Sequence, residues 1–500
     1  MIVATRGLTK TFGSFKAVDS VSLEFAAGQI HAVVGENGAG KSTFLKLLFG
    51  LHEPSAGSVF IDGQPIHLRS SLDAIRAGLG MVQQHFTLVE NLSAIDNIML
   101  GAEPVSFFGI LRRADAIARL EKLLPSASLR VPWDSLVSEL AVGQRQRVEI
   151  LKLLFRESQI LFLDEPTAVL TPQEISELFD VLRALRSQGR TIVLITHKMR
   201  EVLDLCDTYA VFRQGKLVAR GSVKDATPEL IIEAMIGRAL PARELLRTPP
   251  SADVILSARN LMESGAYRGR LNGVSLHVCA AEIVGVAGVE GSGQSAFVES
   301  VMGLREFSGE LEILGSPIKP FSTEKVRSLG VGLVPEDRHH QALWMEESCK
   351  LNYVVGLENE FIHGGLINFN EIDVKSAQWS ASFDVRASSL DVPVEKLSGG
   401  NQQKLIFARE VAGRKPRLLI CHQPTRGVDL AAIDLIYGKL ESLRNEGLGI
   451  LVLSSELDEL IDVCDRLSVF FDGRVTAEFT RDQFDRMKIG SAMTGDVTHA

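Results

Sequence analysis

Residues 35–42 have the composition and spacing of a phosphate-binding loop, G-x-x-x-x-G-K-S. An apolar run at 29–34 precedes the loop and is expected to be a strand, and a helix is expected over 42–49. Glycines let successive backbone N–H groups turn toward an anion, and the helix N-terminus adds its positive end. Lys41 supplies a charge for the β- and γ-phosphates, and the Ser42 hydroxyl is a ligand for Mg²⁺. The loop therefore predicts a nucleoside triphosphate site.

Two adjacent carboxylates follow a second apolar run. Residues 160–163 predict a buried strand that delivers Asp164 and Glu165 to its exposed end. Asp164 is expected to hold Mg²⁺ through water, and Glu165 to polarise an attacking water as general base. His197 follows another predicted strand, 191–195, and is expected to contact the γ-phosphate and orient Glu165. A histidine at a strand end is more often structural, so its assignment depends on its order after the other motifs.

The chain contains a repeat of a whole domain. Residues 33–40 return 253 residues later at 286–293, and 140–144 return 257 residues later at 397–401. In each half, short β-branched runs alternate with helical patterns, which predicts a mainly parallel sheet covered by helices. Residues 86–137 have helical character and fit a helical insert. We expect one domain at 1–240 and another at 254–500, joined by a proline-containing linker at 241–253.

Composition excludes several other classes of protein. The formal net charge of −9 gives no basic face for nucleic acid. No apolar run approaches the roughly 18 residues that cross a bilayer, and the start of the chain has no signal-peptide pattern. Five scattered cysteines predict reduced structural thiols and neither a disulfide framework nor a zinc site. These features predict a cytosolic chain.

Two short segments carry a family resemblance. Residues 140–144 (LAVGQ) and 397–401 (LSGGN) resemble the LSGGQ signature of ABC ATPases, and each opens a predicted helix. Phosphate loop, glutamine loop, signature, carboxylate pair and switch histidine occur in the ABC order over nearly the whole chain. The resemblance implies an α/β fold of two tandem ABC-type P-loop ATPase domains. Each domain would have a mainly parallel β core, an antiparallel β part and a helical subdomain.

The motifs and the resemblance together define a set of candidate site residues. The resemblance identifies Gln84 as the glutamine that senses Mg²⁺ and water, with Gln83 as the alternative, and Phe12 as the aromatic that stacks on adenine, with a place in the core as the alternative. The candidate catalytic residues are Glu165, His197 and Gln84, and the candidate metal ligands are Ser42, Gln84 and Asp164. The candidate residues for binding ATP are Phe12, Gly35, Glu36, Asn37, Gly38, Ala39, Gly40, Lys41, Ser42, Thr43, Ser398, Gly399, Gly400 and Asn401.

The second half lacks the residues that the chemistry needs. Gln294 replaces the loop lysine, Glu336 stands at the glutamine-loop position, and Ser455 replaces the switch histidine. His422 and Gln423 replace the carboxylate pair, and a neutral amide cannot act as a base near pH 7. ABC domains pair head to tail, so the intact first loop would face the intact signature at 397–401. The degraded second loop would face the first signature, in which Ala141 replaces serine. We expect the second loop to bind nucleotide with little or no turnover.

Further segments resemble one branch of ABC importers. Two fused domains, the stretch 335–338 and residues 425–429 are similar to subunits of monosaccharide and nucleoside importers. Residues 81–86, 167–174 and 420–425 look more like the purine-nucleoside branch. This resemblance implies an ATP-hydrolysing importer subunit that uses ATP and Mg²⁺ and energises uptake of a nucleoside or simple sugar.

The same resemblance implies particular partners and a location. The partners are two membrane permease subunits and, indirectly, an extracytoplasmic solute-binding protein, with no nucleic acid. The location is the cytoplasmic face of the plasma membrane, where the chain is peripheral. The alternatives are a monosaccharide importer and, in another class, a soluble double-ABC ATPase that acts on ribosomes or DNA; a non-catalytic nucleotide-binding regulator is disfavoured by the intact first site.

Overall fold

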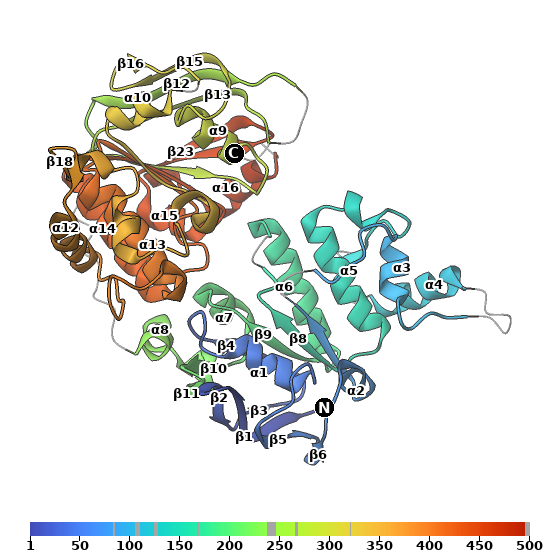
Figure 1. Cartoon of the computed structure of the whole chain (residues 1–500). Coiled ribbons are helices and arrows are strands. Elements are labelled where there is room, and N and C mark those ends of the chain that lie inside the picture. The colour runs from blue at the N-terminus through green and yellow to red at the C-terminus, as the bar shows by residue number, and fades with distance from the viewer. Residues whose placement is uncertain are drawn as a thin grey trace. The chain divides into compact units, whose positions relative to one another are not determined.

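The computed structural model describes residues 1–83, 86–105, 111–124, 129–167, 170–237, 247–265, 269–320 and 322–495. Contacts within the chain divide it into two compact units, Met1–Pro241 and Ala242–Ala500, called here the first and second unit (Figure 1). Within this described part, no helix is both long and apolar enough to cross a membrane. All five cysteines belong to it, and each is a free thiol.

A six-stranded sheet forms the centre of the first unit. Its strands are β4 (Ile30–Val34), β7 (Leu79–Val82), β8 (Ile160–Asp164), β9 (Thr191–Ile195), β10 (Thr208–Arg213) and β11 (Lys216–Ser222). The order is β7-β8-β9-β4-β10-β11, and all neighbours are parallel except the hairpin β10–β11. Every residue of β4, β8 and β9 is buried. Their sequences are apolar except for His31, Asp164 and Thr191, as expected for strands of a parallel sheet that is covered on both faces.

An antiparallel sheet completes the β structure of this unit. It contains β1 (Val3–Phe12), β2 (Phe15–Val21), β3 (Glu24–Phe25), β5 (Ala56–Ile61) and β6 (Gln64–Ile66). The order is β2-β1-β5-β6, and β3 pairs with β1. Helix α1 (Lys41–Leu48) follows β4 and buries Phe44 in a core that includes Leu8 of β1 and Val33 of β4. The helix that follows the phosphate loop is thus held by both sheets.

The other helices of the first unit include a separate helical subdomain. They are α2 (Ser71–Arg76), α3 (Ala94–Met99), α4 (Arg113–Leu123), α5 (Val142–Phe155), α6 (Pro172–Ser187), α7 (Met199–Leu205) and α8 (Pro228–Ile236). Helices α3, α4 and α5 contact one another and lie together in Figure 1. In the described part of 86–137 the regular elements of more than one turn are α3 and α4, which agrees with the predicted helical insert.

The second unit repeats the order of the central sheet strand for strand, and its antiparallel sheet lacks only a counterpart of β3 among the described residues. Its central strands are β14 (Ile283–Ala287), β17 (Val331–Val334), β20 (Leu418–His422), β21 (Gly449–Ser454), β22 (Arg466–Phe471) and β23 (Arg474–Thr480), in the order β17-β20-β21-β14-β22-β23. Its antiparallel sheet contains β12 (Val254–Met262), β13 (Asn272–Cys279), β15 (Ser308–Ile313) and β16 (Ser316–Pro317), in the order β13-β12-β15-β16.

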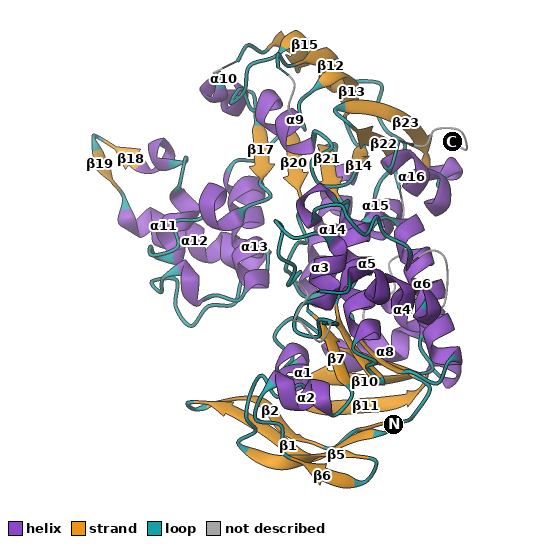
Figure 2. Ribbon diagram, turned by 90° about the vertical axis from the view of Figure 1, so that its right-hand side faces the viewer, coloured by secondary structure: helices purple, strands orange, loops and turns teal. Residues whose placement is uncertain are grey.

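The helices of the second unit follow the same plan. They are α9 (Gln294–Val301), α10 (Thr323–Ser328), α11 (Cys349–Val354), α12 (Phe369–Ser382), α13 (Gly399–Ala408), α14 (Leu430–Asn445), α15 (Leu457–Val463) and α16 (Arg486–Met493). Figure 2 shows α11, α12 and α13 grouped beside a small hairpin of β18 (Ile362–His363) and β19 (Leu366–Ile367). The predicted fold class is confirmed in both units: a mainly parallel core, an antiparallel part and a helical subdomain.

Candidate active site

The phosphate loop of the first unit joins the carboxyl end of β4 to α1. A Cβ atom on Gly35 would lie 2.2 Å from the carbonyl oxygen of Phe212, and one on Gly40 would lie 2.2 Å from that of Ala17. Gly40 also has φ 98°, in the left-handed region that favours glycine. Backbone from β10 and β2 therefore approaches the loop so closely that no side chain fits at these two positions.

Lys41 fills the inside of the loop. Its side chain is only 5% exposed, and its Nζ atom donates to the carbonyl oxygens of Gly35 at 2.7 Å and Glu36 at 2.9 Å. Burial lowers the pKa of Lys41, while Glu165 and Asp164 oppose the shift. A buried cation that donates to the carbonyl oxygens of its own loop is well suited to an incoming polyphosphate.

Ser42 and Asp164 bring two oxygen ligands together. The Ser42 Oγ atom donates to Oδ1 of Asp164 at 3.5 Å, where β8 ends. Asp164 is 6% exposed, and burial raises the pKa of its carboxyl group, with the Ser42 hydrogen bond in opposition. A hydroxyl and a buried carboxylate are the kind of ligands that Mg²⁺ takes, and a cation there would offset the cost of burying the charge. These two residues fit the predicted metal.

Glu165 and His197 form a hydrogen-bonded pair. Nδ1 of His197 lies 3.1 Å from Oε1 of Glu165, and the two residues follow the neighbouring strands β8 and β9. Glu165 has a φ of 48°, and its backbone N–H donates to the carbonyl oxygen of Ile195 at 3.0 Å. The hydrogen bond from His197 lowers the pKa of Glu165, and burial opposes this shift. The carboxylate therefore stays ionised near neutral pH, as a general base must.

The remaining predicted residues of the first unit fall into three groups. Glu36, Asn37, Gly38 and Ala39 lie in the loop and Thr43 in the first turn of α1. Phe12 stands at the end of the hairpin β1–β2 and is 47% exposed, so it is not a core residue. Its ring centroid lies 5.7 Å from that of His52, and Nζ of Lys10 lies 5.3 Å from the same ring. Gln84 lies outside the described residues, whereas its alternative, Gln83, is exposed after β7.

The signature of the second unit forms the N-terminus of α13. Ser398 is the N-cap, and its Oγ atom accepts from the backbone N–H of Asn401 at 3.4 Å and from Nδ2 of Asn401 at 3.0 Å. A Cβ atom on Gly399 would lie 2.9 Å from Nη2 of Arg338 and 3.0 Å from the carbonyl oxygen of Gly427. Backbone N–H groups in the first turn of a helix have no partner within the helix, so this turn presents donors to an anion.

The signature of the first unit is built differently. Helix α5 begins after Ala141, whose side chain makes no capping hydrogen bond. The backbone N–H of Ala141 instead donates to Oε1 of Gln144 at 3.1 Å. The hydroxyl that Ser398 supplies in the second unit has no counterpart here.

The phosphate loop of the second unit keeps the shape but loses the charge. Gln294 is 5% exposed, and its Nε2 atom donates to the carbonyl oxygens of Val286 and Gly288, both at 3.4 Å. Ser295 Oγ donates to Oε2 of Glu336 at 3.4 Å, so the serine has a carboxylate partner from the glutamine-loop position. Gly293 has φ 104°, close to the value for Gly40 in the first loop.

The carboxylate pair is replaced by a different network. Nε2 of His422 lies 3.5 Å from Oε2 of Glu336, and Arg426 Nη1 lies 2.9 Å from Oε1 of the same residue. Burial lowers the pKa of His422 to about 4, so its imidazole is neutral near pH 7. Gln423 keeps the left-handed backbone of Glu165, with φ 51°, and its Oε1 accepts from the backbone N–H of Ser455 at 3.4 Å. The side chain at position 423, which corresponds to Glu165, is therefore a neutral amide that cannot remove a proton from water.

Sequence reasoning missed a buried carboxyl group near the Glu165–His197 pair. Glu201 in α7 is 4% exposed and accepts a hydrogen bond from the Thr167 hydroxyl. The repeat contained a signal for it, since Glu459 stands 258 residues later in the same place of the second unit. Arg338 was noticed as part of a motif, but its contact with the signature glycine was not foreseen.

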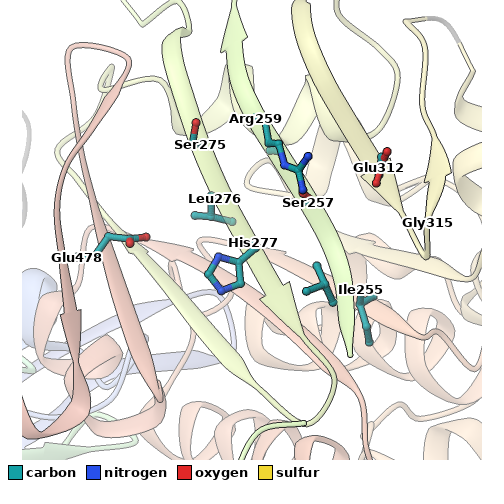
Figure 3. Close-up of a pocket in the computed structure, with 11 residues that line it drawn as sticks. Ile255, Ser257, Arg259, Ser275, Leu276, His277, Glu312, Gly315 and Glu478 are labelled. Atoms are coloured by element: carbon teal, nitrogen blue, oxygen red, sulfur yellow. The ribbon is translucent and has the colours of Figure 1, made fainter. Parts of the chain in front are cut away.

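The second unit also has a cavity of about 590 Å³ on its antiparallel sheet. Figure 3 shows Arg259 and Ser257 on β12, Ser275 and His277 on β13, and Glu478 on β23 around it. Glu478 bonds to Arg466 at 3.2 Å, and Arg259 lies 3.6 Å from Glu310. None of the predicted nucleotide or catalytic residues lines this cavity, so it is separate from the phosphate loop.

Comparison with known proteins identifies the family. The sequence profile described as ABC transporter matches residues 18–168 and 271–426, one segment in each unit. This chain belongs to the ABC transporter family. The ATP-binding proteins of ABC importers are ATPases, and this chain is therefore an ATP-binding ATPase. It has the two-domain layout of the sugar and nucleoside importer branch.

Three relatives match the ABC chain over almost its full length. It is 40% identical to the nucleoside import ATP-binding protein NupA of Lactococcus lactis subsp. cremoris, covering 98% of this chain and 97% of NupA. It is 36% identical to the guanosine import ATP-binding protein NupO of Bacillus subtilis, over 99% of this chain and 98% of NupO. It is 33% identical to the ribose import ATP-binding protein RbsA of Caldanaerobacter subterraneus, over 98% of both chains.

Proposed function

We propose that the chain hydrolyses ATP to energise uptake of a nucleoside, or otherwise a simple sugar, through separate membrane permease subunits. The observation that carries the ATPase part is the hydrogen-bonded pair Glu165–His197 beside a complete phosphate loop. The transport part is supported by full-length similarity to nucleoside and ribose import proteins. Nucleoside is favoured over sugar because residues 81–86, 167–174 and 420–425 resemble the purine-nucleoside branch. Sequence identity does not separate the two, since relatives named for nucleoside and guanosine import have 40% and 36% identity and relatives named for glucose and ribose import have 38% and 36%.

The catalytic proposal assigns one role to each group of the first unit. Lys41 and the loop N–H groups bind the β- and γ-phosphates, and Phe12 stacks on the adenine. Ser42, Asp164 and Gln84 would hold Mg²⁺, which supplies positive charge to the phosphates when bound. Glu165 accepts a proton from the attacking water, whose oxygen bonds to the γ-phosphorus as the bond to the ADP oxygen breaks.

The second unit is proposed to assist that reaction without turnover of its own. In this proposal 1–240 is the catalytic domain, 241–253 the linker and 254–500 the degenerate domain. Ser398 and the N–H groups of Gly399 and Gly400 donate to a γ-phosphate, and Asn401 orients the serine through its side-chain contact. The second loop binds nucleotide through its backbone, because Gln294 preserves its shape without supplying charge.

The proposed partners are inferred from the relatives, which are named as import ATP-binding proteins. Import requires a membrane pore, and we propose two permease subunits, with an extracytoplasmic solute-binding protein delivering the cargo. The chain would then be peripheral on the cytoplasmic face of the membrane. The start of the helical insert just after Gln84, around residues 85–100, is the proposed permease contact.

The experiment reconstitutes the chain with its permease subunits in proteoliposomes and measures ATP turnover and uptake. The wild type is expected to take up a labelled nucleoside in an ATP-dependent manner and labelled ribose poorly. Glu165→Gln should remove turnover and uptake while ATP binding persists, and Gln423→Glu should leave the wild-type rate unchanged. Ribose uptake without nucleoside uptake would establish the sugar alternative, and turnover retained in Glu165→Gln would exclude Glu165 as the base.

A further inference from the structure

Glu201 lies in the first turn of α7, behind the loop that carries His197. Its carboxyl group is 4% exposed, and Oε1 accepts a hydrogen bond from the hydroxyl of Thr167. Thr167 is two residues beyond Glu165 and is itself 2% exposed. The contact therefore joins the segment after the general base to the segment after the switch histidine.

A second hydroxyl strengthens this connection. Burial raises the pKa of Glu201, and Lys198 together with hydrogen bonds to Thr167 and Thr196 opposes the shift. Thr196 directly precedes His197, and its Oγ atom also accepts from the backbone N–H of Lys198 at 3.0 Å. Glu201 stands four residues after His197 and its carboxyl group accepts from Thr167, so it connects the two segments whose side chains meet at 3.1 Å in the Glu165–His197 pair.

The second unit provides an internal comparison. There Glu459 accepts from the hydroxyl of Thr425 at 2.5 Å and from that of Tyr437 at 2.6 Å. The residue 258 positions before Tyr437 is Phe179, which has no hydroxyl. Oε2 of Glu201 has no hydrogen-bond partner within the described part of the chain. Glu459 is only partly buried and its Oε2 atom accepts from two hydroxyl groups, whereas the buried Glu201 accepts from Thr167 at Oε1 and leaves Oε2 unpaired.

We infer that Glu201 is a positioning residue, which holds the loops of Glu165 and His197 at the separation that their hydrogen bond requires. This inference rests on the proposed ATPase function of the first unit. An unpaired buried carboxyl oxygen costs free energy, so packing alone does not favour an acid at this position. Its hydrogen bond to Thr167 links the segments that carry the reacting groups, so its loss should affect the chemical step more than ATP binding.

The test compares matched variants of the two units in the reconstituted transporter. Glu201→Ala is expected to lower kcat by about 10- to 100-fold, the effect of small misplacements of reacting groups, while KM for ATP changes less than about twofold. Glu201→Gln keeps an acceptor for Thr167 and is expected to recover most of the loss. Glu459→Ala removes the equivalent carboxyl group from the second unit and is expected to change kcat by less than about twofold.

Two further measurements separate positioning from a general loss of structure. In a His197→Ala background, Glu201→Ala should lower kcat by a smaller factor than in the wild type, because the pair that it positions is already broken. If Glu201→Ala does not fold, Thr167→Val removes the same hydrogen bond from the other side and should lower kcat in the same way. Normal kcat in the folded variant, or equal losses in Glu201→Ala and Glu459→Ala, would overturn the inference.

A different experimental result would refute the proposed ATPase function. Turnover that survives Glu165→Gln would refute the general base, whatever Glu201 does. Loss of turnover in Glu165→Gln together with normal turnover in Glu201→Ala and Thr167→Val would refute the positioning role alone.

Discussion

Gln294 makes in the second phosphate loop the contact that Lys41 makes in the first. Nζ of Lys41 donates to the carbonyl oxygen of Gly35 at 2.7 Å, and Nε2 of Gln294 donates to that of Gly288 at 3.4 Å. Both side chains are 5% exposed. The amide therefore replaces the ammonium group as an internal support of the loop but brings no charge to a phosphate.

This relationship predicts the outcome of Lys41→Gln. The free energy of unfolding should change by less than about 1 kcal/mol, because the second unit shows that a glutamine supports such a loop. ATP turnover should fall by about a hundred- to a thousand-fold, as expected when a charged donor to the transition state is lost. Thermal or chemical unfolding and steady-state ATPase rates measure the two effects. A strongly destabilised Lys41→Gln, or one with near-normal turnover, would contradict the prediction; Gln294→Lys serves as the reciprocal control.

The metal proposal predicts a shift in Mg²⁺ requirement. Asp164→Asn keeps the shape of the side chain but removes the negative charge that faces Ser42. The Mg²⁺ concentration for half-maximal turnover should rise by at least about tenfold. Titrating turnover with Mg²⁺ at fixed ATP measures this, and removal of Mg²⁺ with a chelator should stop the wild type. An unchanged Mg²⁺ dependence in Asp164→Asn would exclude this residue from the metal site.

The Glu165–His197 hydrogen bond predicts a pH effect of definite sign. It lowers the pKa of Glu165, so the ionised base persists as the pH falls toward and below the ordinary glutamate range. The stabilisation that this pair gives to the fold is likewise present above the unfolded-state pKa and is lost as pH falls through the lowered value. In His197→Ala the pKa of Glu165 should rise, which moves the acid limb of the kcat profile to higher pH.

The turnover of the wild type and the residual turnover of His197→Ala, measured between about pH 3.5 and pH 8, give the position of that limb in each. Ser455→Ala, the equivalent change in the second unit, should leave the profile in place. A limb that stays fixed or moves to lower pH in His197→Ala would show that the histidine does not lower the pKa of the base.

The unequal signatures predict unequal consequences of substitution. Ser398→Arg introduces a bulky cation at the N-cap of α13 and should abolish ATPase activity and transport. Ala141→Ser adds a hydroxyl where no chemistry is proposed and should change turnover by less than about twofold. Both are assayed in the reconstituted transporter at saturating ATP. A large gain from Ala141→Ser would mean that the first signature contributes to a working site.

Short sequence patterns predicted the strands and the loop that hold the site, because each of these elements is specified by neighbouring residues in the chain. The buried strand Thr191–Ile195 coincides with its predicted range, since an apolar run covered on both faces has no alternative pairing that suits it. The phosphate loop could also be predicted from the sequence, because Gly35 and Gly40 stand where neighbouring backbone leaves no room for a side chain. The domain repeat then indicated which second-unit positions had lost their chemistry.

Contacts between residues far apart in sequence were beyond such reasoning. Arg247 fell within the predicted linker, yet its guanidinium group donates to the carbonyl oxygen of Val463 at 3.1 Å and to Asp465 at 3.0 Å. The Glu201–Thr167 contact spans 34 residues, and Glu201 belongs to none of the motifs recognised in the sequence. Such contacts depend on how elements pack in three dimensions, which periodicity and composition do not specify.

The left-handed backbone conformation of Glu165 is kept at the corresponding position of the second unit, where the carboxylate is absent. Gln423 has φ 51° against 48° for Glu165, although it is no longer a base. For a β-branched side chain such a conformation is a steric outlier, whereas asparagine, aspartate and glycine adopt it most readily. Replacement of Gln423 should therefore be tolerated best by residues that adopt this dihedral angle. The backbone conformation thus restricts which side chains can stand at position 423, whether or not the residue there acts as a base.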